Sequence, residues 1–208
     1  MMYVIAGVIG GIALVSIVWR FASRGRSIPC PVWLSWLVEL DNPFARTNRA
    51  AVIIEHLALR PGMTVLDVGC GPGRVTIPAA RAVGPQGKVV AIDLQEGMLA
   101  RAREKAHAAN LTNIRFLRAG AGDGQFAHTT ADRVLLVTVL GEIPDQSAAL
   151  REIYDALVPG GILSVTEIIF DPHFQSRATV SRLTTGVGFR EAAFFGNRLA
   201  YTLNLEKP

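Results

Sequence analysis

Two hydrophobic patterns alternate along most of this chain. Short apolar runs bounded by glycine, proline or aspartate are typical of buried strands, and longer segments with an apolar residue at every third or fourth position are typical of helices. The predicted strands are residues 64–68, 88–92, 113–117, 133–137 and 162–169, and the predicted helices are 44–59, 75–83, 95–109, 147–157 and 174–185. Two final segments, 189–195 and 199–205, flank Gly196-Asn197 and predict a β-hairpin.

This order of elements predicts an α/β fold. Strands that are apolar along their whole length are buried on both faces, which favours a mostly parallel sheet with helices on each face. The five strands and the antiparallel hairpin together give a seven-stranded sheet. In such sheets ligands bind beyond the carboxyl ends of the strands. We therefore expect functional residues at 67–73, 93, 119–123, 138–142 and 167–173.

The N-terminal segment departs from this pattern. Met2–Trp19 contains no charged residue and would span about 27 Å as a helix, close to the thickness of a bilayer core. Arginines follow at positions 20, 24 and 26. We expect residues 1–28 to form one transmembrane helix with a basic juxtamembrane segment, giving a single-pass membrane protein with a cytoplasmic body. A buried core helix and an unusual signal peptide are the alternatives.

Two further expectations concern the region around this helix. Gly7 and Gly11 form a Gly-x-x-x-Gly pair that would allow a homodimer through the membrane helix, although glycine is also common in membrane helices generally. Residues 29–48 place Val32, Trp33 and Trp36 at helical spacing. That segment is predicted either to lie in the membrane interface or to pack on the globular domain, residues 49–208, as a lid.

Composition excludes several classes of protein. The 208 residues are enough for one ordinary domain plus an appendage. The formal net charge is +4, and outside the juxtamembrane segment the basic residues are interspersed with acids. We therefore expect a membrane surface as a partner and no nucleic acid. A lid lying in that surface, formed by residues 29–48, would admit a lipophilic small molecule as the substrate. Cys30 and Cys70 match neither a metal site nor a disulfide framework, so no metal is expected.

The segment Val65–Arg74 carries the strongest functional signal. It is an apolar strand that ends in Gly69, Gly71 and Gly73, spacing that lets a ligand approach bare backbone at a helix N-terminus. A dinucleotide-binding loop would have its third glycine one residue later, where Arg74 stands. Asp67 suits a cationic or zwitterionic ligand better than a pyrophosphate.

Asp93 ends the second predicted strand, 24 residues after Gly69. An acid at this place can accept hydrogen bonds from both hydroxyls of a ribose. It can also simply cap the following helix. The presence of the glycine loop and the acid together favours a nucleoside-containing ligand.

Three motifs together resemble class I S-adenosylmethionine-dependent methyltransferases, of the small-molecule and quinone type. They are Val65-Leu-Asp-Val-Gly-Cys-Gly-Pro-Gly73, Val89-Val-Ala-Ile-Asp93 and Leu157-Val-Pro-Gly-Gly-Ile-Leu163, and the likeness covers about residues 45–208. The resemblance implies a Rossmann-like fold and S-adenosyl-L-methionine as the cofactor. It also implies a set of cofactor-binding residues: Asp67, Gly69, Cys70, Gly71, Gly73, Asp93, Leu94, Ala121 and Thr138.

The same resemblance assigns roles within that set. Gly69 and Gly71 would contact the methionine end of the cofactor, with Asp67 near its ammonium group. Asp93 would hold the ribose, Leu94 would lie against the adenine, and the backbone of Ala121 would meet the adenine edge. One position departs from the family: Gly120 stands where an acid often reads the adenine amino group, so Asp123 or a backbone carbonyl would replace it.

Candidate catalytic residues follow the fourth and fifth strands. Glu142 lies in Leu140-Gly-Glu-Ile-Pro144, and His173 lies in Asp171-Pro-His-Phe174; either could take a proton from an acceptor. A surface acid and a helix-capping loop are the alternatives for them. Glu167, among apolar residues, needs a partner, and Tyr201 is expected to serve in packing.

These observations predict methyl transfer to a lipophilic or membrane-associated small molecule. A lipid amine head group, a quinone precursor and a hydrophobic thiol all remain open as acceptors. The alternative is a membrane-tethered module that binds S-adenosylmethionine with little catalysis. Orientation and desolvation can carry most of this chemistry, which is consistent with the lack of a Ser-His-Asp constellation in the sequence.

Overall fold

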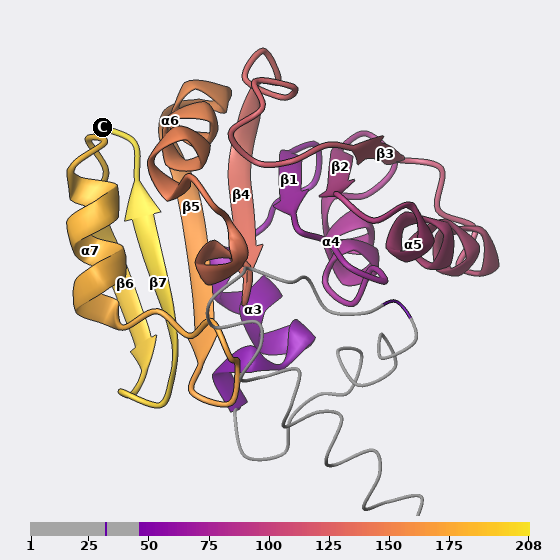
Figure 1. Cartoon of the computed structure of the whole chain (residues 1–208). Helices are drawn as coiled ribbons and strands as arrows, with labels where there is room; N and C mark the ends of the chain where they lie inside the picture. The colour runs from indigo at the N-terminus through magenta and orange to yellow at the C-terminus, as the bar shows by residue number, and fades with distance from the viewer. Residues whose placement is uncertain (1–31, 33–45) are drawn as a thin grey trace, which may run out of the picture.

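A computed structural model describes Val32 and residues 46–208 of the chain (Figure 1). One sheet of seven strands forms its centre, in the order β3-β2-β1-β4-β5-β7-β6. The strands are β1 (Thr64–Val68), β2 (Lys88–Asp93), β3 (Ile114–Arg118), β4 (Ala131–Val137), β5 (Leu157–Ile168), β6 (Arg190–Gly196) and β7 (Ala200–Glu206). The helices are α3 (Ala50–Leu57), α4 (Thr76–Val83), α5 (Glu96–Ala108), α6 (Gln146–Ala156) and α7 (Arg177–Thr185), with short 3-10 helices η2 (Arg46–Asn48) and η3 (Leu140–Glu142).

The first five strands are parallel, and β7 lies antiparallel between β5 and β6. Figure 1 shows this as arrows of β4 and β7 that point in opposite directions. The predicted Rossmann-like α/β fold with a C-terminal antiparallel hairpin is therefore confirmed.

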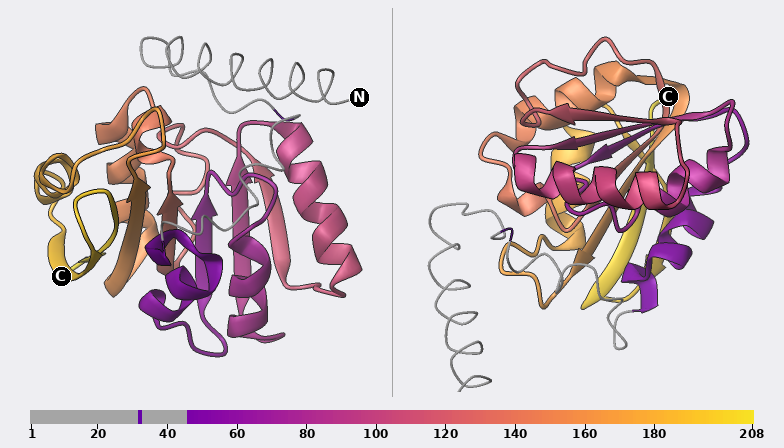
Figure 2. Two further views of the ribbon diagram at one scale, coloured as in Figure 1. Left: turned by 90° about the horizontal axis from the view of Figure 1, so that it is seen from below. Right: turned by 90° about the vertical axis from the view of Figure 1, so that its right-hand side faces the viewer.

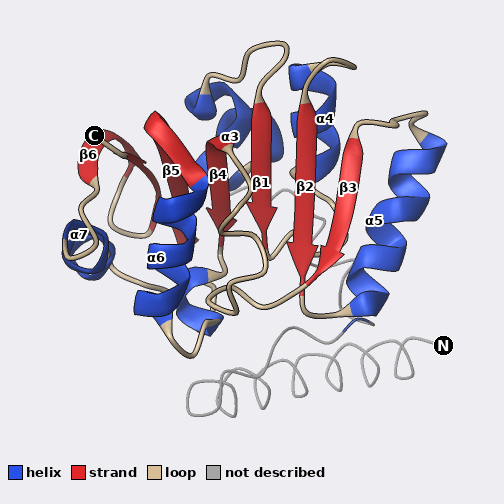
Figure 3. Cartoon of the chain, turned by 90° about the horizontal axis from the view of Figure 1, so that it is seen from above, coloured by secondary structure: helices blue, strands red, loops and turns tan. Residues whose placement is uncertain are grey.

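Helices cover both faces of the sheet, as Figures 2 and 3 show. Neighbouring residues of β1 explain why the strand sequences are continuously apolar. Val65 packs with Ile53 of α3 and Ala79 of α4, whereas Leu66 belongs to the cluster on the other face that contains Leu150 of α6. Burial on both faces removes the polar alternation of a half-exposed strand.

β5 begins earlier than its sequence pattern predicts. Leu157 already pairs with Ala131 of β4, although Pro159-Gly160-Gly161 was expected to separate helix from strand. The register shifts between Ala131 and Arg133, and Gly160 adopts a φ of 76° there. The proline and glycines therefore form an irregular first part of the strand, consistent with a bulge.

α7 begins later than predicted, at Arg177. Ser176 caps it by accepting a hydrogen bond from the Thr179 N–H at 3.2 Å. The predicted first residues of this helix instead form a loop after β5. That loop carries His173, so the shift in the helix start matters for the site.

Within Val32 and residues 46–208, no helix is both long and apolar enough to cross a membrane. The expected single-pass membrane location, with its transmembrane helix, is corrected accordingly, because the structure gives it no support. The segment on which it depended, residues 1–28 with Gly7 and Gly11, lies outside the described residues, as does most of the predicted interfacial or lid helix at 29–48.

Candidate functional site

The glycine loop turns sharply where β1 ends. Gly69, Gly71 and Gly73 have φ values of 73°, 51° and 84°, which L side chains rarely adopt. The N–H groups of Gly69 and Cys70 both donate to the carbonyl oxygen of Ile92 in β2, at 2.8 and 2.9 Å. The loop is therefore held against the neighbouring strand while its glycines shape the turn into α4.

The three glycines serve different purposes. A Cβ on Gly69 would come within 2.5 Å of Val139, and a Cβ on Gly73 would lie 3.1 Å from that of Ala102. These two positions need glycine because other elements pack against them. A Cβ on Gly71 would meet nothing within 4 Å, so the backbone there faces open space that a ligand can enter.

Asp93 is tied to the same loop. Its Oδ2 accepts from the Gly71 N–H at 2.9 Å, and its Oδ1 accepts from the Gln95 N–H at 2.8 Å, just before α5. The capping and the ligand-binding interpretations are compatible, since a carboxylate has lone pairs left for two hydroxyl donors. Burial raises the pKa of Asp93, and the two N–H donors oppose that rise.

Asp67 lies beneath the loop and is almost fully buried. Its Oδ2 accepts a hydrogen bond from the Thr76 hydroxyl at 2.5 Å. Burial raises the pKa of Asp67 to about 6, although the Thr76 hydroxyl and the charge of Arg74 lower it. A cationic group near this carboxylate would favour its ionised form.

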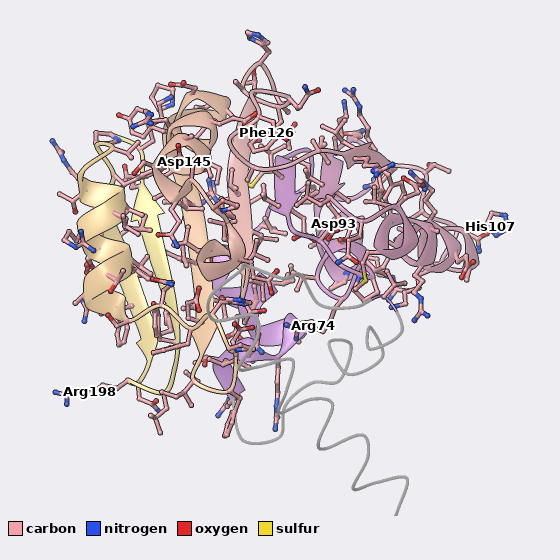
Figure 4. The ribbon with its side chains drawn as sticks, in the orientation of Figure 1. Arg74, Asp93, His107, Phe126, Asp145 and Arg198 are labelled. Carbon is pink, nitrogen blue, oxygen red and sulfur yellow. The ribbon has the colours of Figure 1, made fainter. Side chains whose placement is uncertain are left out.

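Arg74 has a role that the sequence did not indicate. Its guanidinium donates to the carbonyl oxygen of Asn48 at 2.5 Å and to the Asn48 Oδ1 at 2.9 Å. It therefore fastens η2 to the glycine loop. Figure 4 shows Arg74 and Asp93 near each other, between α3 and α5.

Asp123, which was expected to replace the acid absent at position 120, lies beside Gly120. Asp123 Oδ2 accepts from the Gly120 N–H at 3.1 Å, and a Cβ on Gly120 would approach this oxygen to 2.6 Å. The Asp123 carboxylate thus fills the space of a side chain at position 120. Leu94 lies beside it and is 58% exposed, an uncovered apolar surface suited to a planar ring. Ala121 is partly buried against the core.

Cys70 and Thr138 contribute backbone rather than side chain. The Cys70 thiol is buried, and burial raises its pKa further above the usual range. Thr138 has a φ of 54°, and its N–H donates to the Thr166 carbonyl at 2.8 Å. Its hydroxyl bonds to the Val137 carbonyl at 2.7 Å, so this residue shapes the end of β4.

The structure brings the two candidate catalytic residues together. His173 Nδ1 lies 3.6 Å from Glu142 Oε1 and 3.9 Å from Asp171 Oδ1, and the His173 side chain is only 6% exposed. A Cβ on Gly141 would overlap the carbonyl oxygen of His173, so glycine permits η3 to pack this closely. These contacts exclude the interpretation of Glu142 as an isolated surface acid.

Glu142 is tuned by its surroundings. Burial raises its pKa to about 8, and repulsion from Asp171 and Asp93 contributes to the rise. The influence of Asp93 places Glu142 within electrostatic reach of the cofactor half of the site. A carboxyl that ionises near neutral pH is suited to proton transfer.

The sequence of this chain is similar to those of known methyltransferases. Residues 65–161 match the family described as "Methyltransferase domain". The chain is 36% identical over 108 residues to the demethylmenaquinone methyltransferase of Listeria welshimeri, and 35% identical over 115 residues to that of Staphylococcus aureus. These matches cover 52% and 55% of this chain, which spans about half the length of these curated relatives, 46% and 47%.

Solved structures agree with the methyltransferase fold. A SAM-dependent methyltransferase from Aquifex aeolicus superposes with a TM-score of 0.76 at 22% identity, covering 86% of this chain and 100% of that one. The family and the fold imply S-adenosylmethionine as the cofactor of this domain. The open backbone at Gly71, the acceptor oxygens of Asp93 and the uncovered Leu94 fit the amino-acid, ribose and adenine parts of that molecule.

Sequence reasoning missed three contacts of this site: Thr76 with Asp67, Arg74 with Asn48, and Gln175 with Glu167. Arg74 and Asn48 are 26 positions apart, and the other two contacts join residues nine and eight positions apart across the loops after β1 and β5, so no repeating sequence pattern indicates them. Over the part of the chain that the structure describes, no three histidine, cysteine, aspartate or glutamate residues are grouped to hold a metal ion.

Proposed function

We propose that this chain transfers a methyl group from S-adenosylmethionine to a quinone-type small molecule in its hydroquinone form. The observation that carries the proposal is the Glu142–His173 pair, 3.6 Å apart and within electrostatic reach of Asp93. The names of the relatives support the quinone class. The lipid amine and thiol acceptors have no comparable support and become arms of the test.

On the cofactor side, the residues would bind S-adenosylmethionine and orient its methyl group. Gly69, Gly71 and Gly73 offer backbone to the amino-acid end, and Asp93 accepts from the ribose. Asp123 and Leu94 would define the adenine region, with Ala121 adding backbone there. Asp67 lies beneath the loop, where its carboxylate favours a cationic group.

On the acceptor side, Glu142 and His173 would accept the proton that the acceptor releases. When bound, S-adenosylmethionine supplies an electrophilic methyl group, and its transfer leaves S-adenosylhomocysteine. The nucleophilic atom of the acceptor loses a proton, which His173 or the Glu142 carboxylate takes. Their 3.6 Å separation is longer than a hydrogen bond, and catalytic contacts of this kind often tighten when substrate binds.

Residues 29–48 remain a predicted lid. Two described parts of that range meet the cofactor side: Asn48 is held by Arg74, and a Cβ on Gly97 would lie 3.0 Å from the Val32 methyl groups. Gly97 is in the first turn of α5, shortly after Asp93 and Leu94. These contacts support a cover over the adenosine end of the site.

The test is methyl transfer from isotopically labelled S-adenosylmethionine by the full chain. The acceptors are demethylmenaquinone reduced to its hydroquinone, a long-chain amine and a long-chain thiol. We expect label in the hydroquinone product with stoichiometric S-adenosylhomocysteine, and loss of both in His173→Asn. Binding of S-adenosylmethionine without release of S-adenosylhomocysteine from any acceptor would contradict methyl transfer and favour the binding module. Label in the amine or thiol alone would contradict the quinone class.

A further inference from the structure

We infer that Glu167 and Tyr201 are positioning residues, which grip the peptide of Gln175 and thereby hold His173 beside Glu142. This inference rests on the proposed function, because it assigns His173 to proton transfer. Neither residue is expected to touch the reacting atoms. Their effect would reach the reaction through the loop between β5 and α7.

The grip is formed by two strands of the sheet. Glu167 of β5 and Tyr201 of β7 are directly opposite each other in the antiparallel register, and each side chain is about 1% exposed. Glu167 Oε2 accepts from the Gln175 N–H at 3.2 Å, and the Tyr201 hydroxyl donates to the Gln175 carbonyl at 2.7 Å. The backbone N–H and C=O groups of Gln175 are thus both hydrogen-bonded to the cross-strand pair of Glu167 and Tyr201.

Gln175 passes this constraint to His173. The Gln175 side-chain amide donates to the His173 carbonyl at 3.2 Å, and the His173 N–H donates to Asp171 Oδ1 at 2.7 Å. The same carbonyl lies where a Cβ on Gly141 would have to be. A shift of Gln175 would therefore move the His173 backbone relative to η3, which carries Glu142.

The chemistry of the pair indicates a role beyond filling space. Burial of a carboxyl group without sufficient partners is unfavourable, and an apolar residue would fill the interior without that penalty. Burial raises the pKa of Glu167 well above its usual range, with repulsion from Asp171 and Glu142 adding to it. Glu167 Oε1 has no hydrogen-bond partner among the described residues. The unfavourable burial of Glu167 is therefore accounted for by its hydrogen bond to the loop that carries His173, the proposed proton acceptor.

Tyr201→Phe tests this with little change in packing. The ring of Tyr201 contacts Phe174 and Phe194, with centroids 6.2 and 5.9 Å away, and phenylalanine keeps those contacts. Thr202→Val is the matched control. It removes a buried hydroxyl of the adjacent residue, whose 2.9 Å bond to Thr166 Oγ1 does not involve Gln175. Glu167→Gln keeps an oxygen acceptor for the Gln175 N–H, and Glu167→Leu removes it.

The first readout is the pH dependence of the His173 ring signals by NMR, in the full chain bound to S-adenosylhomocysteine. The chain has four histidines, and His173→Gln assigns the signal. We expect Tyr201→Phe and Glu167→Leu to change the His173 titration, and Glu167→Gln and Thr202→Val to leave it unchanged. An unchanged titration in Tyr201→Phe would overturn the inference. So would an equal change in Thr202→Val, which would show a general loosening of the fold.

The second readout is turnover with reduced demethylmenaquinone. We expect Tyr201→Phe to lower kcat roughly tenfold or more, while KM for S-adenosylmethionine stays within about twofold. Equal losses in kcat and in cofactor affinity would contradict a positioning role. If Glu167→Leu does not fold, Tyr201→Phe and Thr202→Val decide the matter. If the wild type has no activity, the proposed function fails, while the NMR titration still decides whether the pair positions His173.

Discussion

The two halves of this site are built by different means. The half at the ends of β1 and β2 consists of backbone: glycines with positive φ and N–H groups held by Ile92 and Asp93. The half at the ends of β4 and β5 consists of side chains, chiefly Glu142, Asp171 and His173. The first half therefore presents mainly a fixed backbone shape, with the carboxyls of Asp67 and Asp93 beside it, and the second presents mainly side chains that can exchange protons.

This difference separates binding from reaction. A backbone cradle cannot change its charge, so it suits a cofactor that is the same in every turnover. Carboxyl and imidazole groups in a partly dry setting respond to pH and to the acceptor. Changes in the first half should alter cofactor affinity, and changes in the second should alter turnover and its pH dependence.

Gly71→Ala is expected to produce the largest effect on the cofactor half. The added methyl group would stand in the open space beside the loop, and we expect S-adenosylmethionine affinity to fall about a hundredfold by calorimetry. Gly62→Ala is the control, since Gly62 also has a positive φ and open space but lies outside the loop. Both variants should lose about 1–2 kcal/mol of stability. Equal cofactor affinities in the two would remove Gly71 from the binding surface.

Asp93→Ala should have the next largest effect, a loss of S-adenosylmethionine affinity of roughly thirtyfold, or about 2 kcal/mol. Asp145→Ala gives the comparison, because Asp145 also precedes a helix and accepts from the Ala148 N–H at 2.8 Å. Figure 4 shows Asp145 near α6, away from Asp93. If both variants bind the cofactor like the wild type, Asp93 is only a structural acceptor.

Glu142→Gln should act on the other half, lowering kcat about tenfold above pH 8 with little change in cofactor affinity. It should also change the pH dependence of stability. The native state keeps a proton on Glu142 up to about pH 8, whereas the unfolded chain releases it near 4.5. The free energy of unfolding therefore falls as pH rises through this interval, and the glutamine variant should lose that slope.

Thermal unfolding of Glu142→Gln at pH 6 and pH 8.5 measures this, with Glu206→Gln as an exposed control. We expect Glu142→Gln to gain stability relative to the wild type mainly at the higher pH. An identical difference at both pH values would mean that Glu142 does not carry the proton.

Asp123→Ala should give the smallest effect, about a threefold loss of cofactor affinity, since a single hydrogen bond near an exposed site contributes little net free energy. Asp155→Ala, at an exposed position of α6, is its control. Comparing S-adenosylmethionine with an analogue that lacks the adenine amino group would sharpen the result. The variant should bind both about equally, and a preserved preference for adenine would place the recognition elsewhere.

The cofactor half was largely predictable from sequence, and the acceptor half was not. The loop at 69–73 and Asp93 lie within short segments whose spacing carries the signal, and the strand at 64–68 has the predicted bounds. Glu142 and His173 were identified singly, but their approach depends on how β4 and β5 pair and on Gly141. Tyr201 was predicted to serve in packing, and its ring is buried in the core; the hydrogen bond from its hydroxyl to the Gln175 carbonyl depends on the fold and could not be read from the sequence.

Local pattern also failed where tertiary contacts decide the outcome. Pro159-Gly160-Gly161 has the composition of a turn, yet Leu157 and Ile162 on either side of it pair with β4, so it lies within a strand. The hydrophobic spacing predicts that Phe174 begins a helix, yet Phe174 belongs to the loop that carries His173, and α7 begins only at Arg177.

The placement of β7 has a consequence for how the protein is made. Among the described residues β6 pairs only with β7, and β7, which is synthesised after β6, inserts between β5 and β6. A nascent chain can assemble β1 to β5 and its glycine loop before that strand exists. Gln175 gains its hydrogen bond from Tyr201, and His173 the constraint inferred above, only once β7 is in place. Synthesis therefore passes through a species with a nearly complete cofactor half and an unfinished acceptor half.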